Sequence, residues 1–388
     1  MNLDGVRVLD LTRLLPGPYA TQLLADCGAD VVKVEDTGAG DYARSMPPLT
    51  EDGHGAVFDA VNRGKRSVAI DLKSDAGQEA FHALAADADV VVEGFRPGVV
   101  DRLGVDYDSV RETNPSIVYC SLSGYGGTGP LSDDVGHDIN YVGLAGLLDM
   151  SRESTEERPR VPGYPIADMA GGLFTAFAVC GALLSRELGD GTGEYVDVGM
   201  SDVVLSFGQA VAPEALRGDD PRPGETPLTG GYPWYDVYEA ADGYVTLGAL
   251  EPQFWRAFCE TVDREEWIDL HMTDDPAERA ALRESLSELF SSRTRDEWLE
   301  TFEGVDATLG GVFTPAEAVE HPQIEARGTV TRDDRGEPRV GFPASGSRIA
   351  DDPGGSLPGQ GEHTEALLRA AGYDDTALEE LRTDGVIR

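Results

Sequence analysis

Short apolar segments alternate with helical patterns over the first third of the chain, and this alternation constrains the fold more than any other feature. Residues 6–11, 30–34, 67–72, 89–93 and 117–122 have the length and apolar content of buried strands. Helical patterns at 18–25 and 75–86 follow two of them. Such alternation predicts an α/β fold with a mostly parallel sheet and helices on both faces. Ligands of such sheets bind beyond the carboxyl ends of the strands. No Gly-x-Gly-x-x-Gly follows the first strand, so a dinucleotide site is not supported.

The pattern changes after residues 213–233, which lack periodicity and contain several Pro and Gly residues. Beyond this segment, two strand patterns flank an Asp242-Gly243 turn signal, and helical patterns follow at 252–261, 276–291 and 295–303. We therefore expect a large domain over 1–212, a linker over 213–233 and a smaller α+β domain over 234–330.

The net charge of -40 is spread over the whole chain, and 40% of the residues are hydrophobic. This composition favours a folded protein with a highly charged surface over a disordered acidic tail. Self-repulsion on this scale is screened at molar salt, where the Debye length is about 3 Å. We therefore expect a halophilic protein from a salt-rich cytoplasm, without nucleic acid as a partner. No signal peptide opens the chain, and the apolar run at 171–184 is too short to span a membrane, so we expect a cytoplasmic protein that does not bind membranes.

His137 is the first candidate for catalysis, because it stands next to Asp138 at the expected start of a helix over 138–148. A helix start offers free N–H groups and positive potential, which suit a developing enolate oxygen. The alternative is that Asp138 caps this helix and that His137 is an incidental neighbour. A metal site is not expected, because no second His follows at the helical spacing and no Cys/His cluster exists.

Two carboxylates are further candidates. Asp168 precedes a long apolar helix, and apolar surroundings would raise its pKa toward neutrality. Glu251 precedes Pro252 at the start of another helix. The alternative for each is that it caps its helix.

Basic residues are scarce, so their positions carry information. Arg63-Gly64-Lys65-Arg66 is the densest basic cluster, and Arg96 lies in a turn after an apolar strand. These cations suit a ligand that bears phosphates. A local salt-bridge patch is the alternative reading.

Several motifs carry a resemblance to a known family over nearly the full length. They are Val8-Leu9-Asp10-Leu11, Pro16-Gly17-Pro18-Tyr19, the run from Leu24 to Glu35, Asn62-Arg63-Gly64-Lys65-Arg66-Ser67, Asp71-Leu72-Lys73, Glu93-Gly94-Phe95-Arg96-Pro97-Gly98 and Gly361-Glu362-His363-Thr364-Glu365. The chain resembles the family III CoA-transferase superfamily. Gly136-His137-Asp138-Ile139-Asn140-Tyr141 and Glu251-Pro252-Gln253-Phe254 are similar to its alpha-methylacyl-CoA racemase branch.

The resemblance implies racemisation of 2-methylacyl-CoA thioesters through an enolate. His137 and Asp168 would move the α proton on opposite faces, and Glu251 would hold the tautomer of His137. The implied fold is a Rossmann-like large domain, completed by 331–388, and a smaller domain. Two chains would form an interlocked homodimer, with each active site between the large domain of one chain and the small domain of the other.

The resemblance also implies the residues that contact CoA, which is part of the substrate; no separate cofactor or metal is expected. These residues are Lys65, Ala69, Ile70, Asp71, Leu72, Arg96, Gly136, Asp138, Asn140 and Tyr141. Asp36 departs from the pattern, because racemases of the family carry there an Arg that packs on the adenine.

Two other activities are compatible with these residues. In a CoA-transferase, Asp168 would be the nucleophile that forms a covalent intermediate. A non-catalytic binder of CoA thioesters is the third option, which the set His137, Asp168 and Glu251 disfavours. His137 separates the first two options, because the resemblance places a His there in racemases and not usually in transferases.

Overall fold

The computed structural model describes residues 2–332, 336–346 and 355–388, and the chain divides into two compact units. Unit 1 contains Met1–Ala145, Gly163–Ser206 and Pro322–Arg388, and unit 2 contains Gly146–Pro162 and Phe207–His321. These bounds differ from the expected domains in three places. Residues 146–162 and 207–212 belong to unit 2 rather than to the large domain, and residues 322–330 belong to unit 1 rather than to the small one.

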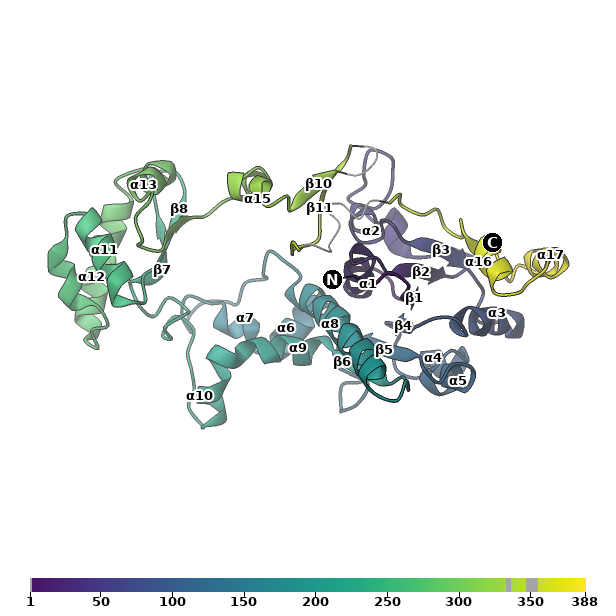
Figure 1. Cartoon of the computed structure of the whole chain (residues 1–388). Helices are drawn as coiled ribbons and strands as arrows, with labels where there is room; N and C mark the ends of the chain where they lie inside the picture. Colours follow the sequence, from purple (N-terminus) through teal and green to yellow (C-terminus); the bar gives the residue numbers. More distant parts are fainter. Residues whose placement is uncertain (1, 333–335, 347–354) are drawn as a thin grey trace. The chain divides into compact units, whose positions relative to one another are not determined.

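A six-stranded sheet lies at the centre of unit 1, with the strand order β3-β2-β1-β4-β5-β6 and all neighbours parallel (Figure 1). The strands are β1 (Arg7–Asp10), β2 (Asp30–Glu35), β3 (Arg66–Ala69), β4 (Val90–Glu93), β5 (Val118–Ser123) and β6 (Tyr195–Gly199). The α/β class with a parallel sheet is therefore confirmed. The order reverses between β1 and β4, and such switch points are where open parallel sheets bind ligands.

Helices cover both faces of this sheet. The helices of unit 1 are α1 (Pro16–Asp26), α2 (Ala56–Val61), α3 (Asp75–Ala85), α4 (Val99–Arg102), α5 (Tyr107–Thr113), α6 (Asp138–Leu144), α8 (Ile166–Leu188), α9 (Met200–Ser206), α15 (Pro322–Ala326), α16 (Thr364–Ala370) and α17 (Asp375–Thr383). The connection through α1 crosses the sheet in one direction and the connection through α3 in the other. Right-handed crossovers therefore place α1 and α3 on opposite faces.

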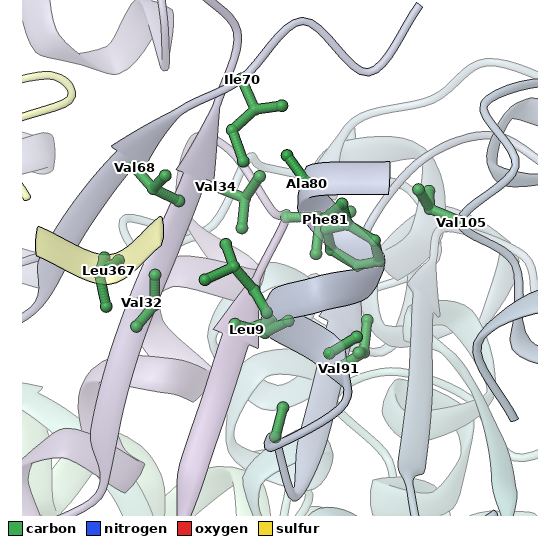
Figure 2. Close-up of a cluster of buried hydrophobic side chains, with 14 of the residues drawn as sticks. Leu9, Val32, Val34, Val68, Ile70, Ala80, Phe81, Val91, Val105 and Leu367 are labelled. Atoms are coloured by element: carbon green, nitrogen blue, oxygen red, sulfur yellow. The ribbon is translucent and has the colours of Figure 1, made fainter. Parts of the chain in front are cut away.

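Alternate residues of the strands form the core on the face of the sheet that α3 covers. Leu9, Val32 and Val91 lie in register on adjacent strands and are buried with Phe81 of α3 and Leu367 of α16 (Figure 2). Their neighbours Val8, Val31 and Val90 point to the other face by the alternation of strands and are also buried. Because both faces are covered, the strands are nearly continuous apolar runs.

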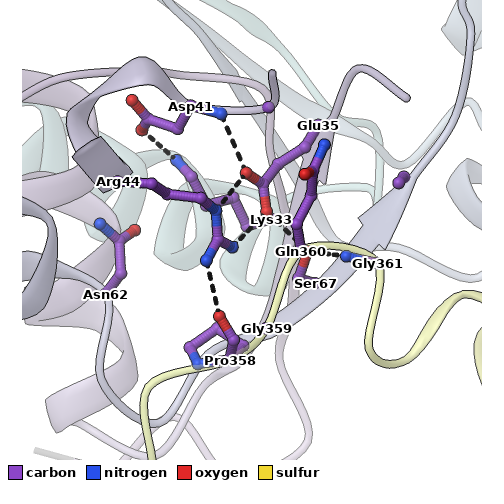
Figure 3. A network of polar contacts seen from close by, with 12 residues as sticks. Lys33, Glu35, Asp41, Arg44, Asn62, Ser67, Pro358, Gly359, Gln360 and Gly361 are labelled. Carbon is purple, nitrogen blue, oxygen red and sulfur yellow. Dashed lines mark hydrogen bonds and ion pairs between the residues drawn. The ribbon is translucent and has the colours of Figure 1, made fainter. Parts of the chain in front are cut away.

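The segment from Pro358 to Arg388 completes the β3 edge of unit 1. Arg44 Nη1 donates to the carbonyl of Pro358 at 2.8 Å, and the Gly361 N–H donates to Ser67 Oγ at 2.9 Å (Figure 3). Ile387 forms an isolated antiparallel bridge with Ile70. A small hairpin of β10 (Val330–Arg332) and β11 (Pro338–Val340) also belongs to this unit.

Unit 2 contains a three-stranded antiparallel sheet in the order β7-β8-β9. Its elements are α7 (Leu147–Met150), α10 (Ala212–Leu216), β7 (Tyr235–Glu239), β8 (Tyr244–Gly248), α11 (Pro252–Thr261), α12 (Pro276–Phe290), α13 (Arg295–Thr301), β9 (Leu309–Gly311) and α14 (Pro315–Val319). Large aromatic rings fill its core, among them Trp234, Trp255, Phe258, Phe290 and Trp298. The expected hairpin of β7 and β8 is present, whereas β9 has the sequence Leu-Gly-Gly and was not anticipated.

Helix α8 has 23 residues and is long and apolar enough to cross a membrane by length and composition. The sequence-based estimate of a shorter apolar run was therefore too low. Half of its apolar window is buried inside the protein, where the helix packs on α1 and β5. Gly172 permits the contact with α1, because a Cβ at this position would lie 2.4 Å from the carbonyl oxygen of Pro16.

Candidate active site

A cavity of about 640 Å³ lies at the switch point of the unit 1 sheet. Its wall includes the segment after β1, the segment after β4 and the end of β5 with the residues that follow it. Both His137 and Asp168 line it, together with Gly136, Asn140 and Tyr141. The parallel topology thus brings together residues that the sequence analysis could only consider one by one.

Asp138 joins the starts of two helices at this cavity. It lies in the first turn of α6, and its Oδ1 accepts hydrogen bonds from the N–H groups of Ala167 at 2.6 Å and Asp168 at 3.1 Å. The N-cap residue of α8 is Pro165, which has no side-chain donor or acceptor, so the carboxylate of Asp138 satisfies N–H groups that this helix start leaves open. This contact therefore holds Asp168 close to His137, the residue that precedes Asp138.

His137 is the N-cap of α6, and its side chain is exposed. Its backbone N–H donates to Asn140 Oδ1 at 3.0 Å, which fixes the entry into the helix. The expected continuous helix over 138–148 is wrong. Gly146 has a left-handed backbone with φ 81°, so α6 ends at Leu144 and α7 begins separately at Leu147.

The Tyr141 ring explains why glycines surround this motif. A Cβ on Gly124 would lie 2.2 Å from the ring, and one on Gly136 would lie 2.7 Å from it. Tyr141 Oη donates to the carbonyl of Gly136 at 2.6 Å, and the ring packs edge-on against Tyr125. The glycine-rich segment thus folds around one aromatic side chain and sets the position of His137.

Asp168 has an unusual acidity for a carboxyl group. Burial, the largest cause, and the nearby carboxylate of Asp138 together raise its pKa from 3.8 to about 6, although His137 acts in the opposite direction. A group with this pKa gives and takes a proton near neutral pH. The alternative that Asp168 is the N-cap of its helix is wrong, because Asp168 lies inside the first turn of α8 and the N-cap residue is Pro165.

We expect Asp168→Asn to stabilise the fold at high pH and not at low pH. The pKa of Asp168 is raised in the folded state, so its stabilising contribution is complete below pH 4 and is lost as the pH rises through about 6. Asparagine removes the cost of the buried charge and should gain about 1–2 kcal/mol at pH 8. Urea unfolding at pH 4 and pH 8 measures this. Exposed Asp133→Asn is the control, and an equal gain at both pH values would contradict the expectation.

The residues expected to contact CoA are divided by the structure. Arg96 is exposed and lines the cavity with its neighbours Phe95 and Pro97. Asp71 and Leu72 are partly buried at the β3 edge, and Ala69 and Ile70 are buried there. None of these four belongs to the cavity lining.

Lys65 lies in the interior and not at the cavity. Its Nζ lies within 3.1 Å of Asp10 Oδ2, the carbonyl of Pro18, Thr21 Oγ1 and Asn62 Oδ1. Burial lowers its pKa to about 8. All of its donors are used inside the protein, which argues against the expected contact of Lys65 with CoA.

Arg13 is a cavity residue that the sequence analysis did not identify. It follows β1, lines the cavity, and its Nη2 lies 3.3 Å from Asp36 Oδ2. Position was the available signal, because residues after the first strand of such a sheet face the ligand. Asp36, which departs from the family pattern, is thus the partner of a neighbouring Arg.

Glu251 lies in unit 2, where it is the N-cap residue of α11 and is exposed. No side-chain hydrogen bond caps this helix. Its capping alternative therefore has no support in this geometry. The expected partner of Glu251, His137, belongs to unit 1.

Known proteins resemble the chain over almost its whole length. A succinyl-CoA:mesaconate CoA-transferase from Haloarcula marismortui is 35% identical, covering 96% of this chain and 97% of the relative. An alpha-methylacyl-CoA racemase from Mus musculus is 33% identical, covering 100% of this chain and 98% of the relative. A crystal structure of a CAIB/BAIF family protein from Brucella suis has a TM-score of 0.82 at 31% identity, covering 95% of this chain and 99% of that one.

The relatives thus include both transferases and racemases, so they identify the family and not the reaction. A model of CoA-transferase family III matches residues 3–364. The cavity at the switch point, with its His, Asp and Arg side chains, is the candidate active site of that family's fold in this protein. The chain belongs to CoA-transferase family III.

Proposed function

We propose that this enzyme racemises 2-methylacyl-CoA thioesters by moving the α proton. The observation that carries the proposal is that His137 and Asp168 line one cavity, with the pKa of Asp168 raised to about 6. An imidazole and a carboxyl group with a raised pKa on one cavity suit a reaction that runs in both directions, because each can give and take a proton. The similarity to an alpha-methylacyl-CoA racemase also supports the proposal.

In the proposed reaction, one group removes the α proton and the other returns a proton to the opposite face. The α C–H bond breaks, its electron pair moves into the enolate, and the proton passes to His137 or Asp168. The other group, initially protonated, then donates to the planar carbon. For one enantiomer His137 is the base and Asp168 the acid, and for the other enantiomer these roles are exchanged.

The proposal includes Glu251 and the rest of the substrate. Glu251 would accept a hydrogen bond from the imidazole of His137 across an interlocked homodimer and hold its tautomer. Arg96 would bind a phosphate of CoA, because a guanidinium presents a fork of donors to phosphate oxygens. The enzyme would act in the cytoplasm.

Deuterium exchange tests the reaction directly. We would incubate one enantiomer of 2-methylacyl-CoA with the enzyme in D₂O, without any free acid, and follow α-deuterium by mass spectrometry and configuration by chiral chromatography. The proposal expects deuterium and inversion together. Absence of exchange, with CoA moving only after a free acid is added, would refute it.

CoA transfer between carboxylic acids is the second candidate, favoured by the position of Asp168 on the cavity wall and by the transferase relatives. In this reaction, the Asp168 carboxylate would attack the thioester carbon, and the C–S bond would break to release the CoA thiolate. The thiolate would then attack the resulting anhydride at the aspartyl carbon and release the first acid. The incoming acid would repeat these two steps in reverse order.

We also propose that the enzyme works in a salt-rich cytoplasm, because its net charge is -40. We expect its thermal midpoint to rise by more than about 10 °C from low salt to molar KCl, as screening removes self-repulsion. Circular dichroism measures the midpoint. Sucrose, which stabilises without screening charges, serves as the comparison. A midpoint that does not change with KCl would exclude the salt requirement.

A further inference from the structure

Lysine is the rarest charged residue of this chain, yet two of its three lysines are inside the protein. Lys33, Lys65 and Lys73 stand among 31 Lys and Arg residues in total. The side chains of Lys33 and Lys65 are 0% exposed. Buried lysine is costly unless its ammonium is fully paired. Their positions therefore need a reason beyond surface charge.

Both lysines pair with aspartates, and both ion pairs contact the same short segment, residues 12–14. Lys33 Nζ lies 3.0 Å from Asp41 Oδ2 and donates to the carbonyl of Thr12 at 2.9 Å (Figure 3 shows the pair with Asp41). Lys65 Nζ lies 3.1 Å from Asp10 Oδ2. Asp10 Oδ1 in turn accepts from the Thr12 N–H at 3.0 Å. The N–H and the carbonyl of Thr12 are thus fixed by the two pairs from inside.

The segment 12–14 has a backbone that needs such support. Leu14 has φ 66°, a left-handed conformation that a branched apolar residue rarely adopts. Its N–H donates to Asp41 Oδ1 at 3.3 Å, so the aspartate that pairs with Lys33 also holds this strained residue. The close approach of Gly17, whose Cβ would lie 2.3 Å from Thr12, packs the segment against the start of α1.

The outer side of the same segment forms part of the cavity. Thr12, Arg13 and Leu14 all line it. The Arg13 guanidinium pairs with Asp36 and lies 5.7 Å from the centre of the Phe95 ring, which also lines the cavity. The inner side of the segment therefore contacts the buried lysine cluster, and the outer side places the cation of Arg13 at the cavity.

We propose that Lys33 is a positioning residue for ligand binding: through Thr12 and Asp41 it holds the segment 12–14 so that Arg13 faces an anionic group of the ligand. The proposal rests on the proposed function, because it takes CoA as that ligand. A compact ammonium fits this role, since it reaches a carbonyl and a carboxylate at once in a closed space. The phosphates of CoA supply the anionic group that Arg13 would bind.

The competing view is that Lys33 only stabilises the fold, and a second ion pair of unit 1 provides the matched control. Arg186 Nη2 lies 2.9 Å from Asp89 Oδ1, and its Nη1 donates to the carbonyl of Ser116. Asp89 directly precedes β4, so this pair lies at the amino end of the sheet, opposite the cavity. Arg186→Met removes a pair that also contacts a carbonyl, but it leaves the segment 12–14 untouched.

The experiment compares Lys33→Met with Arg186→Met in molar KCl. We would measure the Kd for free coenzyme A by calorimetry, the KM and kcat of racemisation, and hydrogen–deuterium exchange of the peptide that covers residues 11–17. For Lys33→Met we expect Kd and KM to rise about tenfold, the loss of one charged hydrogen bond, with kcat changed less than about threefold. The peptide 11–17 should exchange faster. Arg186→Met should lower the thermal midpoint without these effects.

A double variant adds a second criterion. If Lys33 acts through Arg13, Lys33→Met and Arg13→Ala together should weaken coenzyme A binding no more than Arg13→Ala alone. If Lys33→Met does not fold, Asp41→Asn takes its place, because it removes the charge that pairs with Lys33 and weakens the contact with Leu14.

The outcomes separate this inference from the proposed function. Unchanged Kd and unchanged exchange of residues 11–17 in Lys33→Met, or equal effects in Arg186→Met, would overturn the inference. If the unaltered enzyme binds no coenzyme A and racemises nothing, the proposed function fails, and the peptide exchange alone decides whether Lys33 positions the segment. Faster exchange only in Lys33→Met supports that positioning, and equal exchange rejects it.

Discussion

His137→Ala is expected to lower the rate of racemisation by about 10³-fold, the usual contribution of one general acid–base group. One enantiomer should still exchange its α hydrogen with D₂O, because Asp168 remains in the cavity and reaches one face of the substrate. The other enantiomer should not exchange. Mass spectrometry of each pure enantiomer, combined with chiral analysis, measures exchange and inversion separately.

An exposed histidine outside the cavity provides the control for this prediction. His54→Ala removes an imidazole from the surface and should leave both rates unchanged. If His137→Ala racemises as fast as the unaltered enzyme, His137 is not one of the two bases. If it loses exchange but still transfers CoA to a free acid, the cavity supports both reactions.

Asp168→Asn is expected to lower the rate of racemisation by about the same factor as His137→Ala. The enantiomer that does not exchange in His137→Ala should still exchange its α hydrogen in Asp168→Asn. Asparagine keeps the shape of the side chain but takes up no proton, so only His137 can act. The same change should abolish any CoA transfer, because the amide is not a nucleophile for the thioester. The pair of variants should thus give mirror-image exchange patterns.

The stability of Asp168→Asn shows whether a loss of activity in this variant is due to unfolding. The variant should be more stable than the unaltered enzyme at pH 8, because the raised pKa of Asp168 makes its ionised form costly in the folded state. Lost activity in a stabilised protein is not due to unfolding. Asp134→Asn, which removes another carboxylate from the cavity lining, should lower activity less than tenfold. Equal loss in both variants would point to cavity charge rather than to proton transfer.

The alternation of strands and helices was enough to predict the parallel sheet, because its central strands are buried on both faces and are therefore mostly apolar. The prediction failed where contacts distant in the sequence, rather than the local sequence, determine the structure. Strand β9 is a Leu-Gly-Gly segment that becomes a strand only by pairing with β8. The assignment of residues 146–162 to unit 2 depends on contacts such as that of Gly224, whose Cβ would lie 1.9 Å from the carbonyl of Glu153.

His137, Asp168 and Arg96 could be named from the sequence, and the structure places all three on one cavity. The buried position of Lys65 could not be predicted, because a basic cluster has the same sequence pattern whether its charges face a ligand or a buried aspartate. The partner of Lys65, Asp10, lies 55 positions earlier and is brought to it only by the sheet. Arg13 was overlooked for a related reason. Its position after the first strand indicated the carboxyl end of the sheet, but only the strand order shows that the cavity lies beside that strand.

The contact of residues 358–388 with the β3 edge has a consequence for synthesis on the ribosome. Both segments of unit 2 precede residues 322–388 of unit 1 in the sequence, so all of unit 2 leaves the exit tunnel while that edge is still uncovered. Until Ile387 is translated, Ile70 lacks its bridging partner and the nascent chain carries an open sheet edge. We therefore expect the nascent chain to be prone to aggregation until the segment 358–388 covers this edge.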